Sequence, residues 1–503
     1  MDGKAEHLAV SAHDDSTSED ASQDTKDMAR LGKKQQFTRH FDFFSILGFA
    51  CLATIAWEAF LFTFIYGLAN GGPAGLIYGA IFVWAGYAAA VLSLAELMSM
   101  WPTSGGQYHW CYTLSPPRLA PILSYICGWQ SLNSGALIVH FAGFIVVIVV
   151  VAVLSPTEAS TDEVFGVWLN NGYPTQGVSF LVRKKLFKST SMSEVIADLR
   201  VVAFWVGLQG IVFAWVGADA PVHMAEEVRN ASRTIPWAMT GSIIINGILS
   251  FAVLLVVLYF GPTGDALAEA VASPTGFPYL AIFEYATGSA GSATGLIVII
   301  IMMSAVCVAL NFTTASRELW AFARDNAVPG SKTLSRINKN MQLPLWTMLV
   351  TAIATTLLAL VNIGSAVALN AIISLVLAAY TGSYVLPISM VLWRRIQALR
   401  GKGPELPRGP WRLGISGIFI NILALGWIAI IFVFSFFPNA PLPALTIQTM
   451  NRSCLAYGAI CIFAIVCWFI HGKRFYKGPV RDAANGEIEA VLDWTVRRDA
   501  AKM

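Results

Sequence analysis

Long apolar stretches separated by short polar segments occupy the chain from about residue 45 to residue 471. A helix needs roughly 20 apolar residues to cross a hydrocarbon core about 30 Å thick. Stretches of about that length lie at residues 45–68, 73–100, 121–154, 201–223, 238–260, 290–313, 344–362, 366–392, 413–437 and 453–471. Regular strand alternation is absent, which disfavours a membrane barrel. The pattern predicts an all-α integral membrane protein with about ten spans.

The composition agrees with this prediction. Of the 503 residues, 56% are hydrophobic and only 13% are charged, and the mean hydropathy is +0.62. These values lie well outside the range of soluble globular domains, so the apolar surplus requires lipid as a partner. The seven cysteines show no paired metal-ligand spacing. We therefore expect them to be buried small side chains, and we expect neither a metal nor a cofactor.

The polar ends of the chain frame one membrane domain. Residues 1–40 lack the apolar core of a signal peptide and contain acidic and Ser/Thr-rich stretches. We expect them to form a disordered cytoplasmic tail. Residues 41–475 form the predicted transmembrane domain, and residues 476–503 form a second cytoplasmic tail.

The positions of Lys and Arg predict which ends of the spans face the cytoplasm. If the chain begins inside, the segments after the fourth, sixth, eighth and tenth spans are inner, and the cations collect there. The outer loops 261–289 and 438–452 contain only Arg452 between them. Both termini are therefore expected in the cytoplasm. The outer segment 155–200 departs from the pattern, because it carries five cations between Arg183 and Arg200.

Four motifs in a fixed order identify a family resemblance. They are ELMSMWPTSGGQYHW at 96–110, GADAPVHMAEEVRNASRTIP at 217–236, SRELWAFARDNAVP at 316–329 and YVLP at 384–387. Together they resemble signatures of the amino acid-polyamine-organocation permease superfamily, and more narrowly its fungal branch of amino acid, choline and γ-aminobutyrate permeases. The resemblance extends from about residue 40 to residue 475.

The resemblance implies a five-plus-five inverted repeat with two discontinuous helices near the bilayer midplane. Here the breaks are expected in the first span, around Gly48 to Trp57, and in the family's sixth, around Phe213 to Pro221. A broken helix leaves amide groups at one half-helix end and carbonyls at the other. A substrate carboxylate would suit the amides, and an ammonium group would suit the carbonyls.

Two acidic residues lie inside apolar runs, where a carboxylate that faces lipid would cost roughly 2.5–3.5 kcal/mol on insertion scales. Each is therefore expected to face a cavity or a partner. Asp219 matches the family's recurrent acid after the break, which implies cation contact, gating or protonation; a helix cap or a structural hydrogen bond is the alternative. Glu58 follows the first break. It could contact substrate or carry a proton, and a structural polar contact between helices is the alternative.

Aromatic and glycine residues near the breaks complete the candidate site. Aromatic faces attract ammonium groups by contacts worth about 2 kcal/mol when dry, although membrane aromatics often only pack. Glycine permits the backbone to unwind or to approach a ligand, although it also serves close helix packing. The predicted substrate-binding residues are Gly48, Thr54, Trp57, Phe213, Trp215, Gly217 and Asp219.

Charged residues near the breaks are candidates for coupling or gating. In addition to Glu58, four lie at the predicted inner mouth: Glu226, Glu227, Arg229 and Arg233. They could form a gate by exchanging ion pairs, and a solvated helix end is the alternative. His140 and His223 are also candidates, because an ordinary histidine side chain can titrate near neutral pH. Each could act in a proton relay, and a structural role is the alternative.

The sequence departs from the family pattern in one region. The family has twelve spans, and the end of its third and all of its fourth are missing here between Gly128 and Arg183. A segment from Arg183 to Val206 then interrupts the match. We attribute both features to a faulty gene model, which a spliced transcript encoding this chain unchanged would contradict. Transport by the literal sequence is expected to be impaired, because the scaffold beside the moving helices is incomplete.

These features predict a plasma-membrane permease for an amino acid, choline or γ-aminobutyrate, with proton-coupled uptake by alternating access. No nucleotide-binding motif is present, so direct ATP drive is disfavoured, and nucleic acid is not an expected partner. The first alternative is a transport-impaired variant or a non-transporting sensor. The second is a membrane-embedded enzyme, which the scattered positions of the seven histidines disfavour.

Overall fold

The computed structural model describes residues 23–33, 35–128, 138–169, 192–273, 275–338, 341, 343–363, 366–403, 405–438 and 451–479. Within these ranges the regular structure is helical, and β pairing is limited to the isolated bridges Phe41–Val228 and Asn338–Leu343. The predicted all-α class is therefore confirmed for the described residues.

The helices follow one another with short connections. The first half of the chain contains α2 (Phe43–Thr54), α3 (Ala56–Phe62), α4 (Phe64–Met100), α5 (Gly106–Leu114), α6 (Ala120–Gly128), α7 (Ile138–Leu154), α8 (Thr161–Gly166), α10 (Met192–Phe213), α11 (Ala220–His223) and α12 (Ala231–Tyr259). The second half contains α13 (Gly264–Val271), α14 (Pro278–Thr287), α15 (Ala290–Arg324), α16 (Ser331–Leu334), α17 (Leu345–Ile363), α18 (Ala366–Leu399), α19 (Ser416–Phe434), α20 (Ser453–Cys467), the π-helical turn η2 (Trp468–Gly472) and α21 (Lys473–Phe475).

Seven helices among the described residues are long and apolar enough to cross a membrane: Phe43–Phe62, Phe64–Met100, Ala231–Tyr259, Ala290–Arg324, Ala371–Leu399, Ser416–Phe434 and Ser453–Phe475. Three shorter apolar helices, Ala142–Leu154, Val202–Phe213 and Leu345–Leu360, lie where the other three spans were predicted. Length and composition thus support seven spans directly. The expected number of ten is reached only if the shorter helices also cross.

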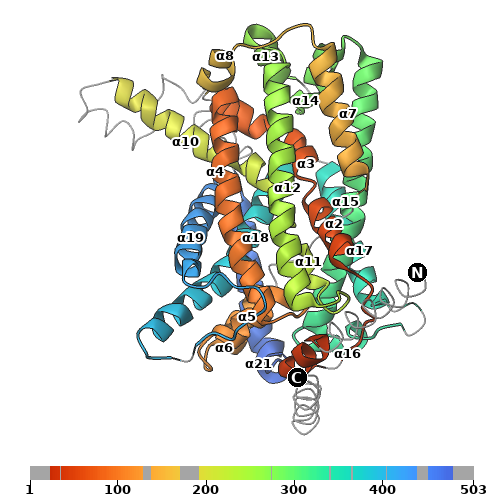
Figure 1. Cartoon of the computed structure of the whole chain (residues 1–503), viewed down its shortest axis with the longest axis vertical. Coiled ribbons are helices and arrows are strands. Elements are labelled where there is room, and N and C mark those ends of the chain that lie inside the picture. The colour runs from red at the N-terminus through yellow and green to blue at the C-terminus, as the bar shows by residue number, and fades with distance from the viewer. Residues whose placement is uncertain are drawn as a thin grey trace, which may run out of the picture.

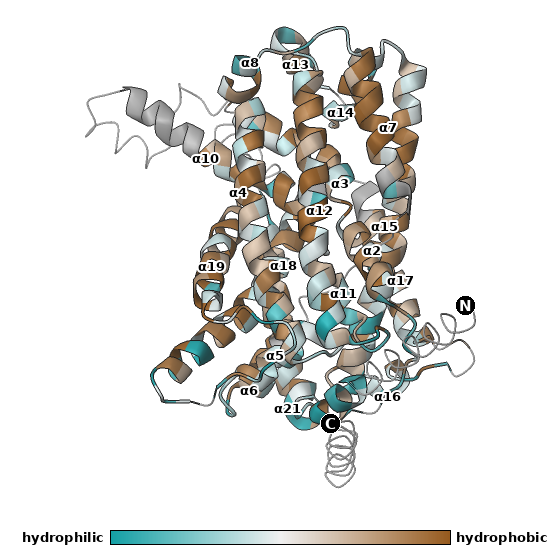
Figure 2. Cartoon of the chain, viewed as in Figure 1, coloured by the Kyte–Doolittle hydropathy of each residue, from teal (hydrophilic) through white to brown (hydrophobic). Residues whose placement is uncertain are grey.

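The long helices form a bundle in which α4 packs against α10, α12 and α19. Figure 1 shows α4 and α12 running along the bundle, with α16 and α21 at its lower end. We call this the inner end, following the predicted orientation. Large apolar side chains are exposed on the outward faces of the helices, among them Val153, Val308, Leu357 and Leu455. Figure 2 shows the hydrophilic residues concentrated toward the two ends, as expected for a bundle surrounded by lipid.

The first predicted break is present. Between α2 and α3, Ile55 has φ 34° and ψ 50°, a left-handed conformation that is rare for a β-branched residue. A second interruption follows at Thr63, and Gly72 with φ 68° then turns the chain before Pro73. The break therefore lies within the predicted interval, whereas Gly48 is buried inside regular α2.

The second predicted break is also present. Helix α10 ends at Phe213, and six residues in turns precede the short helix α11. Gly217 has φ 104°, and a Cβ atom added there would lie 2.5 Å from the carbonyl oxygen of Ala53. The two breaks therefore touch each other, and only glycine permits this approach.

The N-terminal segment differs from the expected disordered tail. Residues 23–31 form a helix, and Met28, Leu31 and Phe37 are buried against the rest of the protein. Apolar residues within a mostly polar stretch provide this contact, and overall polarity concealed them. At the other end, Tyr476 is buried beside Tyr125.

The irregular region of the sequence lies largely outside the described residues. They exclude residues 129–137 and 170–191, which contain most of the missing-span junction and the start of the 183–206 segment. The remainder of that segment, residues 192–206, forms the beginning of α10.

Candidate functional site

The carboxylate of Asp219 is held at the second break by side chains from two other helices. The hydroxyl of Tyr380 on α18 donates to Oδ1, and Nε2 of Gln107 on α5 donates to Oδ2. The same Tyr380 hydroxyl accepts from the backbone N–H of Gly217 at 2.8 Å. Nε2 of His223 lies 3.9 Å from Oδ2. We call these four side chains (Asp219, Tyr380, Gln107 and His223) the Asp219 cluster, and all four are buried.

The contacts of Asp219 in this conformation are with protein groups. The residue faces protein partners and not lipid, and although it is the N-cap of α11, its side chain makes no capping bond. Because both carboxylate oxygens already accept a hydrogen bond, the side chain ties the second break to α5 and α18. It does not offer an open anionic face in this conformation.

Aromatic rings surround the Asp219 cluster. The ring centroids of Tyr380 and Tyr384 are 4.7 Å apart, and Tyr87 lies 5.9 Å from Trp215 and 5.2 Å from Trp427. All five rings are buried. Trp215 was predicted as a site residue, whereas Tyr380 and Tyr87 were missed. Tyr380 precedes the motif residue Tyr384 by four positions, so it lies on the same face of α18.

A second buried cluster lies on the other side of the break contact. Nδ1 of His140 on α7 is 2.8 Å from Oε1 of Glu58 on α3, and its Nε2 is 3.1 Å from Oδ1 of Asn246 on α12. Nδ2 of Asn246 donates to the carbonyl of Cys51 at 2.9 Å and to Oγ1 of Thr54. We call Glu58, His140, Asn246 and Thr54 the Glu58 cluster, and it joins α2, α3, α7 and α12.

The remaining predicted residues fall into two groups. Trp57 covers the Glu58 cluster, with its ring 6.1 Å from that of His140, and it is fully buried. Gly48 and the partly buried Phe213 belong to neither cluster. The structure therefore brings together Thr54, Trp57 and Glu58 on one side of the contact, and places Gly217, Trp215 and Asp219 on the other.

Ion pairs close the inner end. Arg324 donates to both carboxylate oxygens of Glu226 at 3.0 and 2.8 Å, and Arg317 donates to Glu227 at 2.9 Å. Lys33 pairs with Asp325 at 3.4 Å, and Tyr108 donates to the other oxygen of Asp325 at 2.8 Å. We call these residues the inner network: Lys33, Glu226, Glu227, Arg317, Arg324 and Asp325.

The predicted gating residues differ in whether they take part in the inner network. The acids Glu226 and Glu227 pair with cations at the end of α15, and Arg233 is exposed on the first turn of α12. Burial alone would raise the pKa of Glu226, but the cations of Arg324, Lys33 and Arg39 lower it below its ordinary value. The acid is therefore ionised and paired at neutral pH.

The N-terminal segment covers the inner network. Nε2 of Gln35 donates to the carbonyl of Glu226 at 2.6 Å, and the backbone N–H groups of His40 and Phe41 donate to the carbonyl of Glu227 at 2.9 and 3.1 Å. Burial lowers the pKa of the Lys33 ammonium although Asp325 lies beside it. This cover could not be predicted from the sequence, because the partners lie about 190 residues away along the chain.

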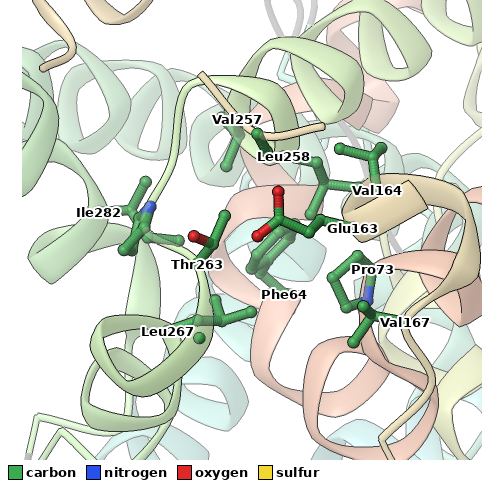
Figure 3. Close-up of a pocket in the computed structure, with 13 residues that line it drawn as sticks. Phe64, Pro73, Glu163, Val164, Val167, Val257, Leu258, Thr263, Leu267 and Ile282 are labelled. Atoms are coloured by element: carbon green, nitrogen blue, oxygen red, sulfur yellow. The ribbon is translucent and has the colours of Figure 1, made fainter. Parts of the chain in front are cut away.

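Free space is distributed unevenly along the bundle. Beside the breaks, a cavity of about 10 Å³ between Phe60, Trp84 and Trp215 has room for about one water molecule. At the end opposite α16 and α21, a cavity of about 170 Å³ is lined mainly by apolar side chains, with Glu163 and Thr263 as its polar members (Figure 3). Another cavity, of about 100 Å³, lies beside Glu96 and Arg395, near the ends of α4 and α18.

The described residues contain no group of three or more His, Cys, Asp or Glu side chains that could hold a metal ion.

Comparisons with known proteins agree with the motifs. Residues 129–465 match the family model described as amino acid permease. An uncharacterized amino-acid permease of Schizosaccharomyces pombe is 27% identical, over 93% of this chain and 92% of the relative. A choline transporter of Saccharomyces cerevisiae is 27% identical over 93% of this chain and 87% of its own length. Amino-acid permease 2 of Neurospora crassa is 27% identical over 90% and 89%.

Proposed function

The chain belongs to the amino acid permease family, whose members are membrane transporters and not enzymes, and on that premise we propose that it takes up an amino acid, choline or γ-aminobutyrate together with protons. Transport proceeds by alternating access across the plasma membrane, with both termini in the cytoplasm. The similarity to a choline transporter and to amino-acid permeases supports small amine-bearing solutes as substrates.

The contact between the two helix breaks carries this proposal. Gly217 of the second break lies against the carbonyl of Ala53 in the first, and Tyr380 bonds to the backbone of the second. Unwound backbone in the middle of a membrane protein is tolerated only where protein or a cavity surrounds it. A substrate ammonium at this place would meet carbonyl groups and the faces of Tyr87 and Trp215.

The distribution of space fits one state of an alternating-access cycle. The inner network closes the cytoplasmic side, and the cavity of about 170 Å³ lies at the other end. Since the cavity at the breaks holds only about 10 Å³, substrate entry requires the helices around the breaks to move.

Uptake measurements test the proposal. The full-length protein is expressed in cells that lack their own amine permeases, and uptake of radiolabelled leucine, arginine, γ-aminobutyrate and choline is measured at several external pH values. We expect saturable uptake of at least one probe, faster at acidic external pH. Absence of uptake of every probe, at wild-type surface levels, would support the transport-impaired variant or sensor.

An Asp219→Asn variant tests the second break. Asn keeps the shape of the side chain but loses the charge that strengthens the bonds from Tyr380 and Gln107. Hydrogen bonds to charged groups are worth about 1.5–3 kcal/mol, so we expect uptake to fall about 10- to 100-fold at unchanged surface expression. Uptake equal to that of the wild type would remove Asp219 from the transport cycle.

A further inference from the structure

We propose that the coupling proton binds between Glu58 and His140, and that its presence holds α3 against α7 and α12. The proposal deepens the proposed function, on which it rests, by naming where the proton resides. Asp219, the acid that the family resemblance singles out, is not that place.

The placement of the pair is the first reason. Both side chains are fully buried, and both lie within apolar helices. Ionisable groups at such depth are costly, and they are retained mainly where they act in transport or pair with one another. Glu58 lies three residues after the left-handed Ile55, so the proton site is attached directly to the first break.

The hydrogen bonds around His140 fix where protons must be. Asn246 directs its amide nitrogen to the carbonyl of Cys51, so its oxygen is the atom that faces His140. Nε2 of His140 must therefore carry a hydrogen and donate it. A bond of 2.8 Å between Nδ1 and Oε1 of Glu58 then requires one further proton, on either the imidazole or the carboxyl group.

Loss of that further proton leaves two acceptors facing each other. With Nε2–H held by Asn246, Nδ1 presents a lone pair to an ionised Glu58 carboxylate at 2.8 Å, which is repulsive. Helix α3 has only seven residues and is interrupted at both ends, by Ile55 and by Thr63. It is the element of this contact that can move as a unit, so deprotonation separates α3 from α7.

The second carboxylate oxygen of Glu58 is an atom to which a proton can bind. Oε2 is buried and has no hydrogen-bond partner among the described residues, and the same holds for Nε1 of the adjacent Trp57. Cys307 of α15 also lies close to Glu58, and its sulfur accepts a hydrogen bond from Nδ2 of Asn311 at 3.0 Å. An arriving proton therefore finds a free acceptor on Glu58, with His140 already positioned to share it.

The Asp219 cluster lacks this property. Both of its carboxylate oxygens already accept a hydrogen bond, one from Tyr380 and one from Gln107. His223 donates from Nδ1 to the carbonyl of Ser104 at 3.0 Å and stands 3.9 Å from Asp219. In Glu58, by contrast, Oε2 has no hydrogen-bond partner among the described residues.

A transport experiment separates coupling from movement of substrate. The purified full-length protein is reconstituted into liposomes, with Glu58→Gln as the test variant and Glu284→Gln, an exposed acid on α14, as the matched control. Counterflow of radiolabelled choline, γ-aminobutyrate or arginine needs no proton gradient, whereas accumulation under an imposed pH difference does. With one proton per solute and no voltage, one pH unit supports at most about tenfold accumulation.

The expected result is selective. Glu58→Gln keeps counterflow but loses accumulation, so the inside-to-outside ratio under the pH gradient falls to unity, while Glu284→Gln behaves as the wild type. Accumulation by Glu58→Gln at the wild-type level overturns the proton site. Absence of counterflow in the wild-type protein counts against the proposed function, and the proton site is then decided by the measurement that follows.

Infrared difference spectra between acidic and alkaline pH need no substrate and no transport. In lipid nanodiscs, the wild type and Glu284→Gln are expected to show the stretching band of a buried protonated carboxyl group that titrates. Glu58→Gln should lose this band, and Asp219→Asn should keep it. If the band persists in Glu58→Gln, or vanishes only in Asp219→Asn, the assignment is wrong. Thermal melting of each variant in the same nanodiscs controls for loss of the fold.

Discussion

The helix breaks and the inner network close the same bundle by different physical means. At the breaks, backbone lies directly on backbone, with Gly217 against the carbonyl of Ala53. At the inner end, long side chains such as Arg324 reach acids on other elements, and the N-terminal segment adds main-chain hydrogen bonds. Ion pairs can exchange their partners for water, whereas a backbone contact has no substitute. The breaks are therefore held by backbone contact, and the inner end by side-chain pairs and the N-terminal segment.

Adding a side chain at Gly217 should disrupt the contact between the two helix breaks. This is the largest effect on uptake and stability that we predict. Alanine there would place its Cβ 2.5 Å from the carbonyl oxygen of Ala53 and would hold a φ of 104°. The backbone conformation alone costs about 1–3 kcal/mol, and the contact adds to it. We expect Gly217→Ala to abolish uptake and to lower the melting temperature of the detergent-purified protein.

Gly295→Ala is the matched control, because it adds a Cβ in a long helix with no atom within 4 Å. It should keep both uptake and melting temperature. Equal behaviour of the two alanine variants would show that the breaks do not depend on the close approach, and the contrast between the two regions would then lose its basis.

The breaks were predicted from the family resemblance, and local residues agree with that prediction only at the second break. Glycine and proline in the segment that contains Gly217 and Pro221 favour an interrupted helix. A polar residue in an apolar run indicates a buried polar partner. Ile55 gave no such signal, since a β-branched residue disfavours the left-handed conformation that it adopts. Packing from neighbouring helices imposes that conformation, and sequence alone does not describe packing.

The partners of each charged residue could not be predicted, for a different reason. Arg317 and Arg324 were visible as inner cations, but their acids lie 90 and 98 residues earlier in the chain. Glu58 and His140 are 82 residues apart, and a lone histidine in an apolar helix has no pattern that names its partner. Sequence spacing fixes neighbours only within one helix, whereas both clusters and the inner network join different helices.

Removal of the Glu226 carboxylate should open the inner end without disturbing the breaks. Glu226→Ala leaves Arg324 buried without its partner, and breaking such a pair costs about 3–5 kcal/mol. Hydrogen–deuterium exchange followed by mass spectrometry should then show the amides of His40 and Phe41 exchanging about 100-fold faster or more. Amides of α4 should be unchanged. An unaltered rate at residues 40 and 41 would show that the ion pair does not hold the N-terminal segment.

The same amides report the pH dependence of the inner network. Since the pKa of Glu226 is lowered in the folded protein, its stabilising contribution is complete above the ordinary carboxyl value of 4.5. The contribution is lost as the pH falls through the lowered value. Protection at residues 40 and 41, corrected for intrinsic exchange rates, should therefore stay constant from neutral pH down to about that value and decline below it. Glu226→Ala should remove this decline.

Replacement of Arg233 should have the smallest effect that we predict. It tests which charged residues belong to the inner network. The sequence made it a gating candidate, but the structure places it in solvent on the first turn of α12, while Arg317 and Arg324 hold the acids. Exposed residues away from a network change stability by at most about 0.5 kcal/mol, so Arg233→Ala should leave uptake and the exchange of residues 40 and 41 within about twofold of the wild type. Arg317→Ala, measured beside it, should accelerate that exchange because Glu227 loses its buried partner. If the two variants behaved alike, charge at the inner end would act only through its sum, and the specific pairs would have no separate role.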